Sequence, residues 1–311
     1  NGRSYSQNID TTVMPNGVVY VVAKIYDAVG NFTYSPKQRY MCDNQGPEQV
    51  KNVKCIAVDG TTATLSWSDV SDDDISYFVV ECKQSDGVWK SVSRTSTNLG
   101  VNLSGLTPEH DYVYRVIGYD KRSNRGTPSE EITVTTLKDT ICPKVTKITP
   151  DPGYFKSEIN LRFTAEDDYR VKSIEIQTST DKESWKTVSE IKATGESAKC
   201  TFDCKLDLKN YEEGSVFVRA KVYDSYGNVT EDKDLTCYEY VVDRTAPIQP
   251  TGVTASSGET EGGSSFVNIS WNAITDDNSF AYYRVYKSNS ADGEFTLLKN
   301  NVKTVNTYDE N

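Results

Sequence analysis

Apolar and polar residues alternate along two closely matching stretches of the chain, VVYVVAKIYDAVGNFT from Val18 and SVFVRAKVYDSYGNVT from Ser215. Because successive side chains of a strand point to opposite faces, this alternation predicts one strand in each copy. A Gly-Asn pair then predicts a tight turn, because both residues tolerate positive φ. One type of domain is therefore expected to occur twice. The face predicted to lie in its core carries Val19, Val21, Ala23 and Ile25 in the first copy and Val216, Val218, Ala220 and Val222 in the second.

A second pattern follows each of these stretches. The run ATLSW leads into SDVSDDDISYFVVE, and the run VNISW leads into NAITDDNSFAYYRVY, so that each copy predicts a core strand ending at Trp67 or Trp271. Between the two copies, Ile159, Leu161, Phe163 and Ala165 alternate with polar residues and predict a further buried strand. The sequence therefore predicts an all-β chain made of two alternating kinds of β-sandwich.

Two known families share these patterns. The strand, the Gly-Asn turn and the Asp-x-x-x-Pro exits DNQGP and DRTAP resemble the end of bacterial immunoglobulin-like (Big-type) domains. The core tryptophan and the run LTPEHDYVYRV, with Tyr112 at the start of the penultimate strand, resemble fibronectin type III domains. The resemblance implies tandem antiparallel β-sandwiches, fibronectin type III-like and immunoglobulin-like, in an elongated array.

The resemblance divides the chain into four segments. Residues 1–44 are expected to be the C-terminal part of an immunoglobulin-like domain, 45–138 a fibronectin type III domain, 139–243 an immunoglobulin-like domain, and 244–311 the N-terminal part of a fibronectin type III domain. Each complete unit has about 100 residues, which is enough to bury a core of its own. We therefore expect the sequence to be a window of a longer chain of similar domains.

The charge of the chain excludes several partners. Its formal net charge is -11 and its pI is about 4.8, so it repels nucleic acid and anionic membrane surfaces. No run of residues approaches the roughly 18 to 20 apolar positions of a membrane span. We expect no nucleic-acid partner and no direct membrane insertion, which leaves protein or glycan partners open.

Catalytic groups are scarce. The single histidine, His110, lies in the run before Tyr112 and is expected to be a surface turn residue. Ser-His-Asp, Cys-His and HExxH schemes all need a positioned imidazole, and the acidic clusters fall in turns without the concave scaffold of a glycosidase. This segment is therefore expected not to be an enzyme and to need no cofactor other than calcium.

Calcium is the metal that the acidic loops favour. A similar loop precedes a strand in both copies of the second pattern, and its candidate ligands are Asp72, Asp73, Asp74, Asp276 and Asp277. Hard cations take six to eight oxygen ligands, and adjacent aspartates point in different directions, so a solvated turn is the alternative. Bound calcium would stiffen the array.

Cysteine gives little information about the compartment. Seven cysteines are an odd number, so at least one lies outside any intrachain disulfide. Cys200 and Cys204 lie about 13 Å apart on one expected strand, which is too far for a bond between them. Free thiols and scattered disulfides both remain open.

Two tryptophans are candidates for a ligand platform. Trp89 and Trp185 each follow a short acidic turn, and exposed indole rings at such places stack on sugars, although packing against the sandwich is the alternative. Trp67 and Trp271 are instead expected in cores. With short linkers between its domains, the chain is expected to serve as a stalk or adhesion segment of a bacterial extracellular protein, either secreted or on the cell surface. The alternative is a non-catalytic, glycan-binding accessory region of a secreted carbohydrate-active enzyme.

Overall fold

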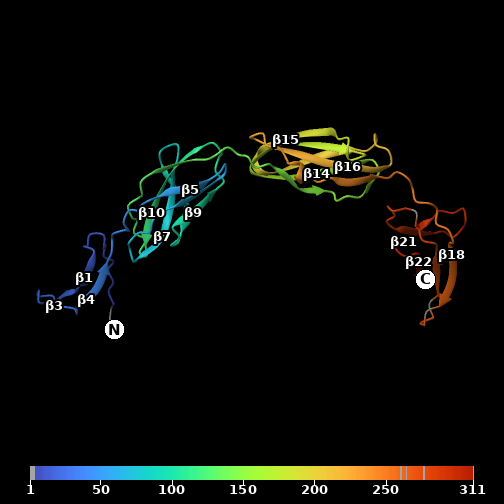
Figure 1. Cartoon of the computed structure of the whole chain (residues 1–311). Coiled ribbons are helices and arrows are strands. Elements are labelled where there is room, and N and C mark those ends of the chain that lie inside the picture. The colour runs from blue at the N-terminus through green and yellow to red at the C-terminus, as the bar shows by residue number, and fades with distance from the viewer. Residues whose placement is uncertain (1–3, 260, 264, 276, 311) are drawn as a thin grey trace.

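The chain folds almost entirely into strands. The computed structural model describes residues 4–259, 261–263, 265–275 and 277–310. Its strands form four groups that follow one another in sequence order, with the two ends of the chain at opposite ends of the array (Figure 1). Within the described ranges the one helical element is the three-residue 3-10 turn η1 (Asp232–Asp234). The predicted all-β class with tandem β-sandwiches is confirmed.

The described part of the chain holds no helix that is long and apolar enough to cross a membrane.

The second group of strands, here called the first sandwich, consists of two antiparallel sheets. One sheet has the order β5-β6-β9 and the other β11-β10-β7-β8. Their inner faces enclose a core that includes Trp67, Phe78, Val80 and Tyr114, all at most 5% exposed. The strands are β5 (Lys54–Val58), β6 (Thr62–Ser66), β7 (Ile75–Lys83), β8 (Trp89–Thr95), β9 (Gly100–Ser104), β10 (Asp111–Asp120) and β11 (Ile132–Thr135).

The third group, here called the second sandwich, is built around two strands of 22 residues each. Its strand order is β12-β14-β16-β17-β13, with β15 paired to β14. The strands are β12 (Lys144–Thr149), β13 (Tyr154–Phe155), β14 (Glu158–Ser179), β15 (Lys186–Asp207), β16 (Gly214–Asp224) and β17 (Tyr238–Val242). The ladder between β14 and β15 is interrupted between Glu166 and Val171, so the first half of β14 pairs with β12 and the second half with β16. This interruption lies where the first sandwich has the loop between β6 and β7.

The core of the second sandwich confirms the alternation read from the sequence. Ile159, Leu161, Phe163 and Ala165 on β14 are each at most 1% exposed, because their face of the strand is covered by the opposite half of the sandwich. The predicted core face of the repeated strand is also buried on β16, at Val216, Val218, Ala220 and Val222.

The first copy of the repeated strand behaves differently. Its strands are β1 (Gly17–Val21), β2 (Lys24–Tyr26), β3 (Phe32–Tyr34) and β4 (Gln38–Cys42). Val19 and Val21 are half-buried, but Ala23 is exposed and Ile25 is 50% exposed, so the predicted core face is wrong at these two positions. The physical reason is that residues 4–43 include no counterpart of β14 or β15, the strands that cover this face in the second sandwich.

The last group repeats part of the first sandwich. Its strands are β18 (Thr254–Glu259), β19 (Ser265–Ser270), β20 (Tyr283–Lys287), β21 (Thr296–Val302) and β22 (Asn306–Glu310). The order β18-β19-β22 matches β5-β6-β9, and the pair β20-β21 matches β7-β8. Trp271 is 8% exposed at the position that corresponds to Trp67, as expected for a core tryptophan.

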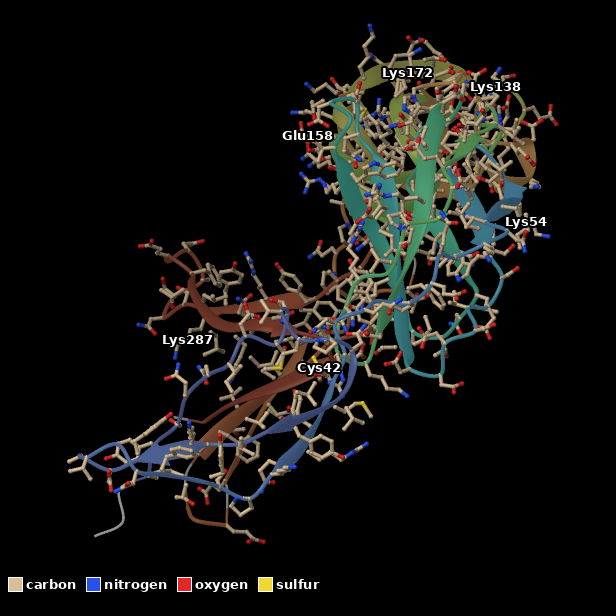
Figure 2. The ribbon with its side chains drawn as sticks, turned by 90° about the vertical axis from the view of Figure 1, so that its left-hand side faces the viewer. Cys42, Lys54, Lys138, Glu158, Lys172 and Lys287 are labelled. Carbon is tan, nitrogen blue, oxygen red and sulfur yellow. The ribbon has the colours of Figure 1, made fainter. Side chains whose placement is uncertain are left out.

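Three linkers join the four groups, here called the first junction (residues 43–53), the second junction (136–143) and the third junction (243–253). Lysine side chains such as Lys54, Lys138 and Lys172 are exposed and reach out to solvent (Figure 2). At the first and second junctions, by contrast, aspartates are buried: Asp120, Asp139 and Asp224 are each 1–2% exposed. The division into four segments with the bounds given above stays a prediction.

Candidate cation-binding sites at the domain junctions

Each of the first three groups of strands contains a turn of the same kind, and in each turn one aspartate accepts the hydrogen bonds that hold it. In each turn, one carboxylate oxygen accepts hydrogen bonds from the backbone amides two and four residues further along the chain. The other oxygen accepts from the side-chain amide of the asparagine four residues on, at 2.8, 2.8 and 2.6 Å. The three pairs are Asp27 with Asn31, Asp120 with Asn124, and Asp224 with Asn228. Such side-chain bonds stabilise a turn locally, so the motif Asp-x-x-x-Asn explains the turn.

The asparagine of this turn also holds the linker that enters its sandwich. At the first junction Asn124 Nδ2 donates to the carbonyl oxygen of Asp43 at 3.1 Å. At the second junction Asn228 Nδ2 donates to the carbonyl oxygen of Asp139 at 3.2 Å. Asp139 begins a third Asp-x-x-x-Pro sequence, which ends at Pro143. Both junctions therefore join an Asp-x-x-x-Pro linker to an Asp-x-x-x-Asn turn, an arrangement here called the linker clamp.

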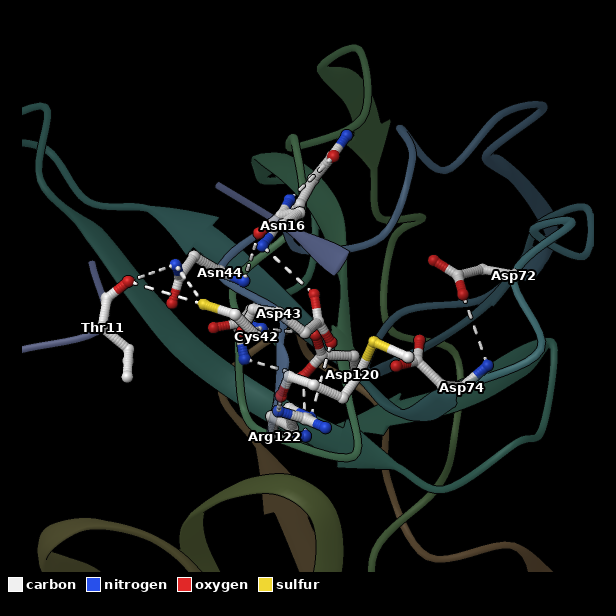
Figure 3. A network of polar contacts seen from close by, with 12 residues as sticks. Thr11, Asn16, Cys42, Asp43, Asn44, Asp72, Asp74, Asp120 and Arg122 are labelled. Carbon is white, nitrogen blue, oxygen red and sulfur yellow. Dashed lines mark hydrogen bonds and ion pairs between the residues drawn. The ribbon is translucent and has the colours of Figure 1, made fainter. Parts of the chain in front are cut away.

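Further polar contacts surround the first linker clamp. Asn44 Nδ2 donates to the carbonyl oxygens of Thr11 and Met14, at 2.6 and 3.2 Å, and its backbone amide donates to Asn16 Oδ1 at 2.8 Å (Figure 3). From the first sandwich, Arg122 donates to the carbonyl oxygen of Met41 at 2.8 Å. The Asn44 bonds fix the linker to the first group of strands, and the Arg122 bond joins that group to the first sandwich.

The second linker clamp has two additional bonds between the sandwiches. Thr61 Oγ1 donates to Asp168 Oδ2 at 2.8 Å, and Tyr226 Oη donates to the carbonyl oxygen of Pro108 at 3.2 Å. Both bonds connect loops of the first sandwich to the end of the second sandwich that faces it. The second junction is therefore held at three points.

Carboxylates from three segments meet at the first junction. Asp43 comes from the linker, Asp74 from the loop before β7 and Asp120 from the end of β10, and one oxygen of each lies within 4.8 Å of the others (Figure 3). Arg122 Nε lies 3.7 Å from Asp43 Oδ2. A positive side chain therefore accompanies this acidic cluster.

A second cluster has the same origin at the second junction. Asp139 comes from the linker, Asp167 from the interruption in β14 and Asp224 from the end of β16, again with one oxygen of each within 4.8 Å of the others. Asp139 Oδ1 accepts from the amide of Ile141 at 2.9 Å, while its Oδ2 is buried without a hydrogen-bond partner. Asp167 Oδ2 accepts from the amides of Tyr169 and Arg170, while its Oδ1 is also buried without a partner.

The surroundings of this second cluster disfavour its negative charges. Burial, opposed in part by the Tyr169 amide and reinforced by the charges of Asp139, Asp168 and Asp224, raises the pKa of Asp167 to about 6. Burial also raises the pKa of Asp139, again with contributions from neighbouring carboxylates. Carboxylates that lose water and gain no positive partner are costly, so a bound cation would relieve both effects.

The predicted calcium ligands are placed differently from one another. Asp74 joins Asp43 and Asp120, as described above. Asp72 Oδ1 accepts a hydrogen bond from the backbone amide of Asp74 at 3.3 Å. Asp73 is exposed, and its carbonyl oxygen accepts a hydrogen bond from Lys121 Nζ at 3.2 Å. The structure thus brings one of the three adjacent aspartates into an acidic cluster.

The corresponding loop at the third junction is described in part. Asp276 lies outside the described residues. Asp277 Oδ1 accepts from the backbone amide and hydroxyl of Ser279, at 2.7 and 2.6 Å, and Asp277 lines the same shallow pocket as Asp243. Calcium at Asp72, Asp73, Asp74, Asp276 and Asp277 stays a prediction.

Trp89, the first candidate for a sugar platform, is half-buried and stacks with cations. The guanidinium carbon of Arg115 lies 4.0 Å from its ring centroid, and Lys83 Nζ lies 5.5 Å away. Arg115 in turn forms an ion pair with Glu81 at 2.6 Å. Cation–π contacts of this kind hold the ring against the sheet, so a sugar would have to use the remaining ring surface.

Trp185 repeats this arrangement in the second sandwich. The guanidinium carbon of Arg219 lies 4.0 Å from its ring centroid, and Arg219 Nε donates to Gln177 Oε1 at 2.8 Å. The indole Nε1 donates to the carbonyl oxygen of Lys182 at 3.0 Å. A platform at Trp89 or Trp185 stays a prediction.

The turn before Trp185 gives a pH prediction. Backbone amides of Ser184 and Glu183, with the hydroxyl of Ser179, lower the pKa of Asp181 to about 2. A lowered folded-state pKa contributes stability above the unfolded value, and this stability is lost as the pH falls toward 2. We expect a carbon-detected NMR titration to show Asp181 still ionised at pH 3, and an Asp181→Asn variant to lose less stability than the parent chain between pH 4 and pH 2. A midpoint near 4 for Asp181 would contradict this.

Tyr112, near the start of the penultimate strand β10 of the first sandwich, holds the preceding loop through its hydroxyl group. Tyr112 Oη accepts a hydrogen bond from the backbone amide of Thr107 at 2.8 Å. A Tyr112→Phe substitution leaves that amide without its acceptor, and we expect it to lower the free energy of unfolding by about 1 kcal/mol. Urea denaturation of the full chain, followed by Trp fluorescence, checks this. An unchanged midpoint would show that water replaces the hydroxyl at no cost.

The structure also places the cysteines and the single histidine considered from the sequence. All seven cysteines are free thiols, as one of the two open alternatives expected, and Cys42, Cys82 and Cys204 are buried. His110 is exposed, and its ring lies 4.8 Å from that of Tyr112.

Sequence reasoning missed most of the residues of the two clusters. Asp120, Asp139, Asp167 and Asp224 were not among the predicted ligands, because each lies in a different segment and only folding brings them together. Two signals in the sequence could have found part of the set. The Asp-x-x-x-Asn motif recurs at Asp120 outside the two matching stretches, and the Asp-x-x-x-Pro motif recurs at Asp139.

Solved structures and one protein family are similar to this chain or to parts of it. Among solved structures, the FN1–FN3 domains of chicken CNTN1 are 17% identical with a TM-score of 0.39, covering 86% of this chain and 89% of that chain. A fibronectin type III domain of human fibronectin type III domain containing protein 3 is 25% identical with a TM-score of 0.29, covering 31% and 92%. The sixth such domain of the same human protein is 21% identical with a TM-score of 0.28, covering 32% and 92%. The fibronectin type III domain family matches residues 48–135, and this part of the chain is a fibronectin type III domain.

Proposed function

We propose that this chain is a structural spacer of a bacterial extracellular protein, in which stacked sandwiches hold other domains apart. The observation that supports the proposal most strongly is the repeated linker clamp. Asn124 and Asn228 bind the linker in the same way at two successive junctions, although the two sandwiches differ in strand order. Since relative motion is the default for domains with small polar contacts, a repeated clamp serves to limit that motion.

The bacterial and extracellular parts of the proposal rest on resemblance. Residues 139–243 carry the strand, turn and exit pattern that resembles bacterial immunoglobulin-like domains, and fibronectin type III domains are common outside cells. The negative charge suits a solvated stalk, because it keeps neighbouring chains apart. Adhesion to a protein or glycan partner is a further property that such a stalk can carry.

Small-angle X-ray scattering of the full chain in calcium-free buffer tests the spacer. We expect a pair-distance distribution with a long tail and a bell-shaped Kratky plot, because the sandwiches are extended and fixed. The double variant Asn124→Ala with Asn228→Ala removes both clamps and should give a Kratky plot that rises at high angle. A wild-type chain that already shows this rise has flexible junctions, which would overturn the proposal.

Binding assays separate a pure spacer from an adhesin. A glycan array and a pull-down with the full chain are expected to give no specific partner in the micromolar range. Specific binding that is lost in Trp89→Ala or Trp185→Ala would instead support the predicted platforms. Such a result would replace the spacer by an adhesion function.

A further inference from the structure

The second junction concentrates negative charge without a positive partner. Asp139 and Asp224 are 2% and 1% exposed, Asp167 is half-buried, and Asp168 and Asp59 add charge to the neighbourhood. None of the ion pairs between described residues includes Asp139, Asp167 or Asp224. Buried charges in proteins are ordinarily paired or coordinate a metal, so this junction lacks the compensation that its burial requires.

Two oxygens of this cluster have no hydrogen-bond partner. Asp139 is only 2% exposed. Its Oδ1 accepts a hydrogen bond from the amide of Ile141, while its Oδ2 has no partner among the described residues. Asp167 Oδ1 is left over in the same way after Oδ2 has accepted two amides. Asp224 differs, because both of its oxygens accept bonds within the turn. A carboxylate oxygen has two lone pairs, and among the described residues Asp224 Oδ2 accepts only the Asn228 side-chain amide, so this oxygen still has a lone pair for a cation.

The spacing of the cluster suits calcium. Calcium–oxygen distances are about 2.3 to 2.6 Å, so two ligands on opposite sides of one ion lie about 5 Å apart. The three carboxylate oxygens lie within 4.8 Å of one another and can therefore contact a single ion. Magnesium needs a tighter octahedron at about 2.0 to 2.1 Å and gives up its water reluctantly. Carboxylate oxygens without nitrogen or sulfur donors also select hard cations over zinc or copper.

The first junction provides a contrast within the same chain. Two residues after the turn aspartate, the first sandwich has Arg122 and the second sandwich has Tyr226. Arg122 lies 3.7 Å from Asp43 and supplies positive charge to its cluster. Tyr226 is neutral and donates its hydroxyl to the carbonyl oxygen of Pro108. Each junction thus has a cluster of three aspartates, and the two junctions differ in the residue that could neutralise the cluster.

We propose that the second junction binds one calcium ion between the carboxylates of Asp139, Asp167 and Asp224, and that Arg122 takes the place of such an ion at the first junction. Asp139 belongs to the linker, whereas Asp167 and Asp224 belong to the second sandwich. The ion therefore ties the linker to the sandwich that follows it, beside the bond from Asn228. Its effect on bending of the chain rests on the proposed spacer function, whereas the binding itself does not.

Calorimetric titration of the chelator-treated full chain with calcium chloride at pH 7.5 tests the binding. We expect saturable binding with a dissociation constant on the order of 10⁻⁴ to 10⁻³ M, the range of extracellular modules. Asp139→Asn keeps the size of the side chain but removes its charge, and should weaken this binding at least about 10-fold. Asp167→Asn gives a second reading on the same site if Asp139→Asn fails to fold by circular dichroism.

Thermal melting with a matched pair of variants tests the role of the positive charge. At about 10 mM calcium we expect the wild-type melting temperature of the second sandwich to rise by about 7 to 13 °C. Tyr226→Arg places a guanidinium where Arg122 stands in the first sandwich, and this variant should lose the calcium-induced rise. Tyr226→Phe removes the bond to Pro108 without adding charge, and should keep that rise.

Three results would each overturn the proposal. These are no saturable calcium heat in the wild-type chain up to about 10 mM, wild-type affinity in both Asp139→Asn and Asp167→Asn, and an equal stabilisation by magnesium at the same concentration. None of them bears on the spacer, because the scattering experiment above is carried out in calcium-free buffer. Failure of the site and failure of the proposed function are therefore distinguishable.

Discussion

An Asn228→Ala substitution is expected to lower the free energy of unfolding of the second sandwich by about 2 to 3 kcal/mol and to release its linker. The side-chain amide of Asn228 donates to Asp224 Oδ2 at 2.6 Å and to the carbonyl oxygen of Asp139 at 3.2 Å. Asp224 is 1% exposed, so its ionised carboxylate would lose a donor where water has little access. Hydrogen–deuterium exchange of peptides from β16 and from residues 136–143 measures both effects in the full chain.

Asn31→Ala is the matched control for this prediction. Asn31 makes the same side-chain bond to Asp27, but both residues are exposed and no linker contact to Asn31 is described. We expect a smaller loss there, with no change in exchange at the second junction. Equal effects of the two substitutions would show that the turn matters and that the linker contact does not.

A Phe163→Ala substitution is expected to cost about 3 to 5 kcal/mol of unfolding free energy in the second sandwich. Phe163 is 1% exposed and lies in the core formed by β12, β14, β15 and β16. Removal of its ring leaves a cavity that strands fixed by ladders on both sides cannot readily fill. Scanning calorimetry of the full chain should show one transition moved to lower temperature while the transition of the first sandwich stays in place.

Tyr154→Ala controls for the loss of an aromatic ring in the same sandwich. Tyr154 is 47% exposed on the short strand β13, so its removal creates no closed cavity and should change the transition little. A loss of less than about 1 kcal/mol in Phe163→Ala would contradict the description of this core. A parallel loss in the first sandwich would show that the two sandwiches unfold as one unit.

The strands and cores could be predicted from the sequence wherever one face of a strand lies in a core and the other face lies in solvent. The alternation at Ile159, Leu161 and Phe163 translates directly into burial, because a strand alternates its side chains between core and solvent. Ile25 shows the limit of this reasoning. Its pattern matches that of Val222, but a pattern states which residues share a face and not whether another sheet covers that face.

The candidate site was harder to predict, for a physical reason. Carboxylates act together when they lie within a few ångströms, and Asp139, Asp167 and Asp224 are separated by 28 and 57 positions along the chain. The adjacent Asp72, Asp73 and Asp74 attract attention in the sequence, yet neighbours on an extended chain point apart. Repetition of the Asp-x-x-x-Pro and Asp-x-x-x-Asn motifs was the better signal, because it marks the segments that meet at each junction.

The linker clamp is tested most directly by residual dipolar couplings of backbone amides in the weakly aligned, calcium-free full chain. Two sandwiches that tumble as one body share a single alignment tensor, whereas sandwiches that move independently have tensors of different magnitude. We predict that tensors fitted separately to residues 54–135 and 144–242 agree in magnitude and orientation in the wild-type chain and diverge in Asn228→Ala. Different magnitudes in the wild-type chain would contradict the claim that the clamp holds the two sandwiches together.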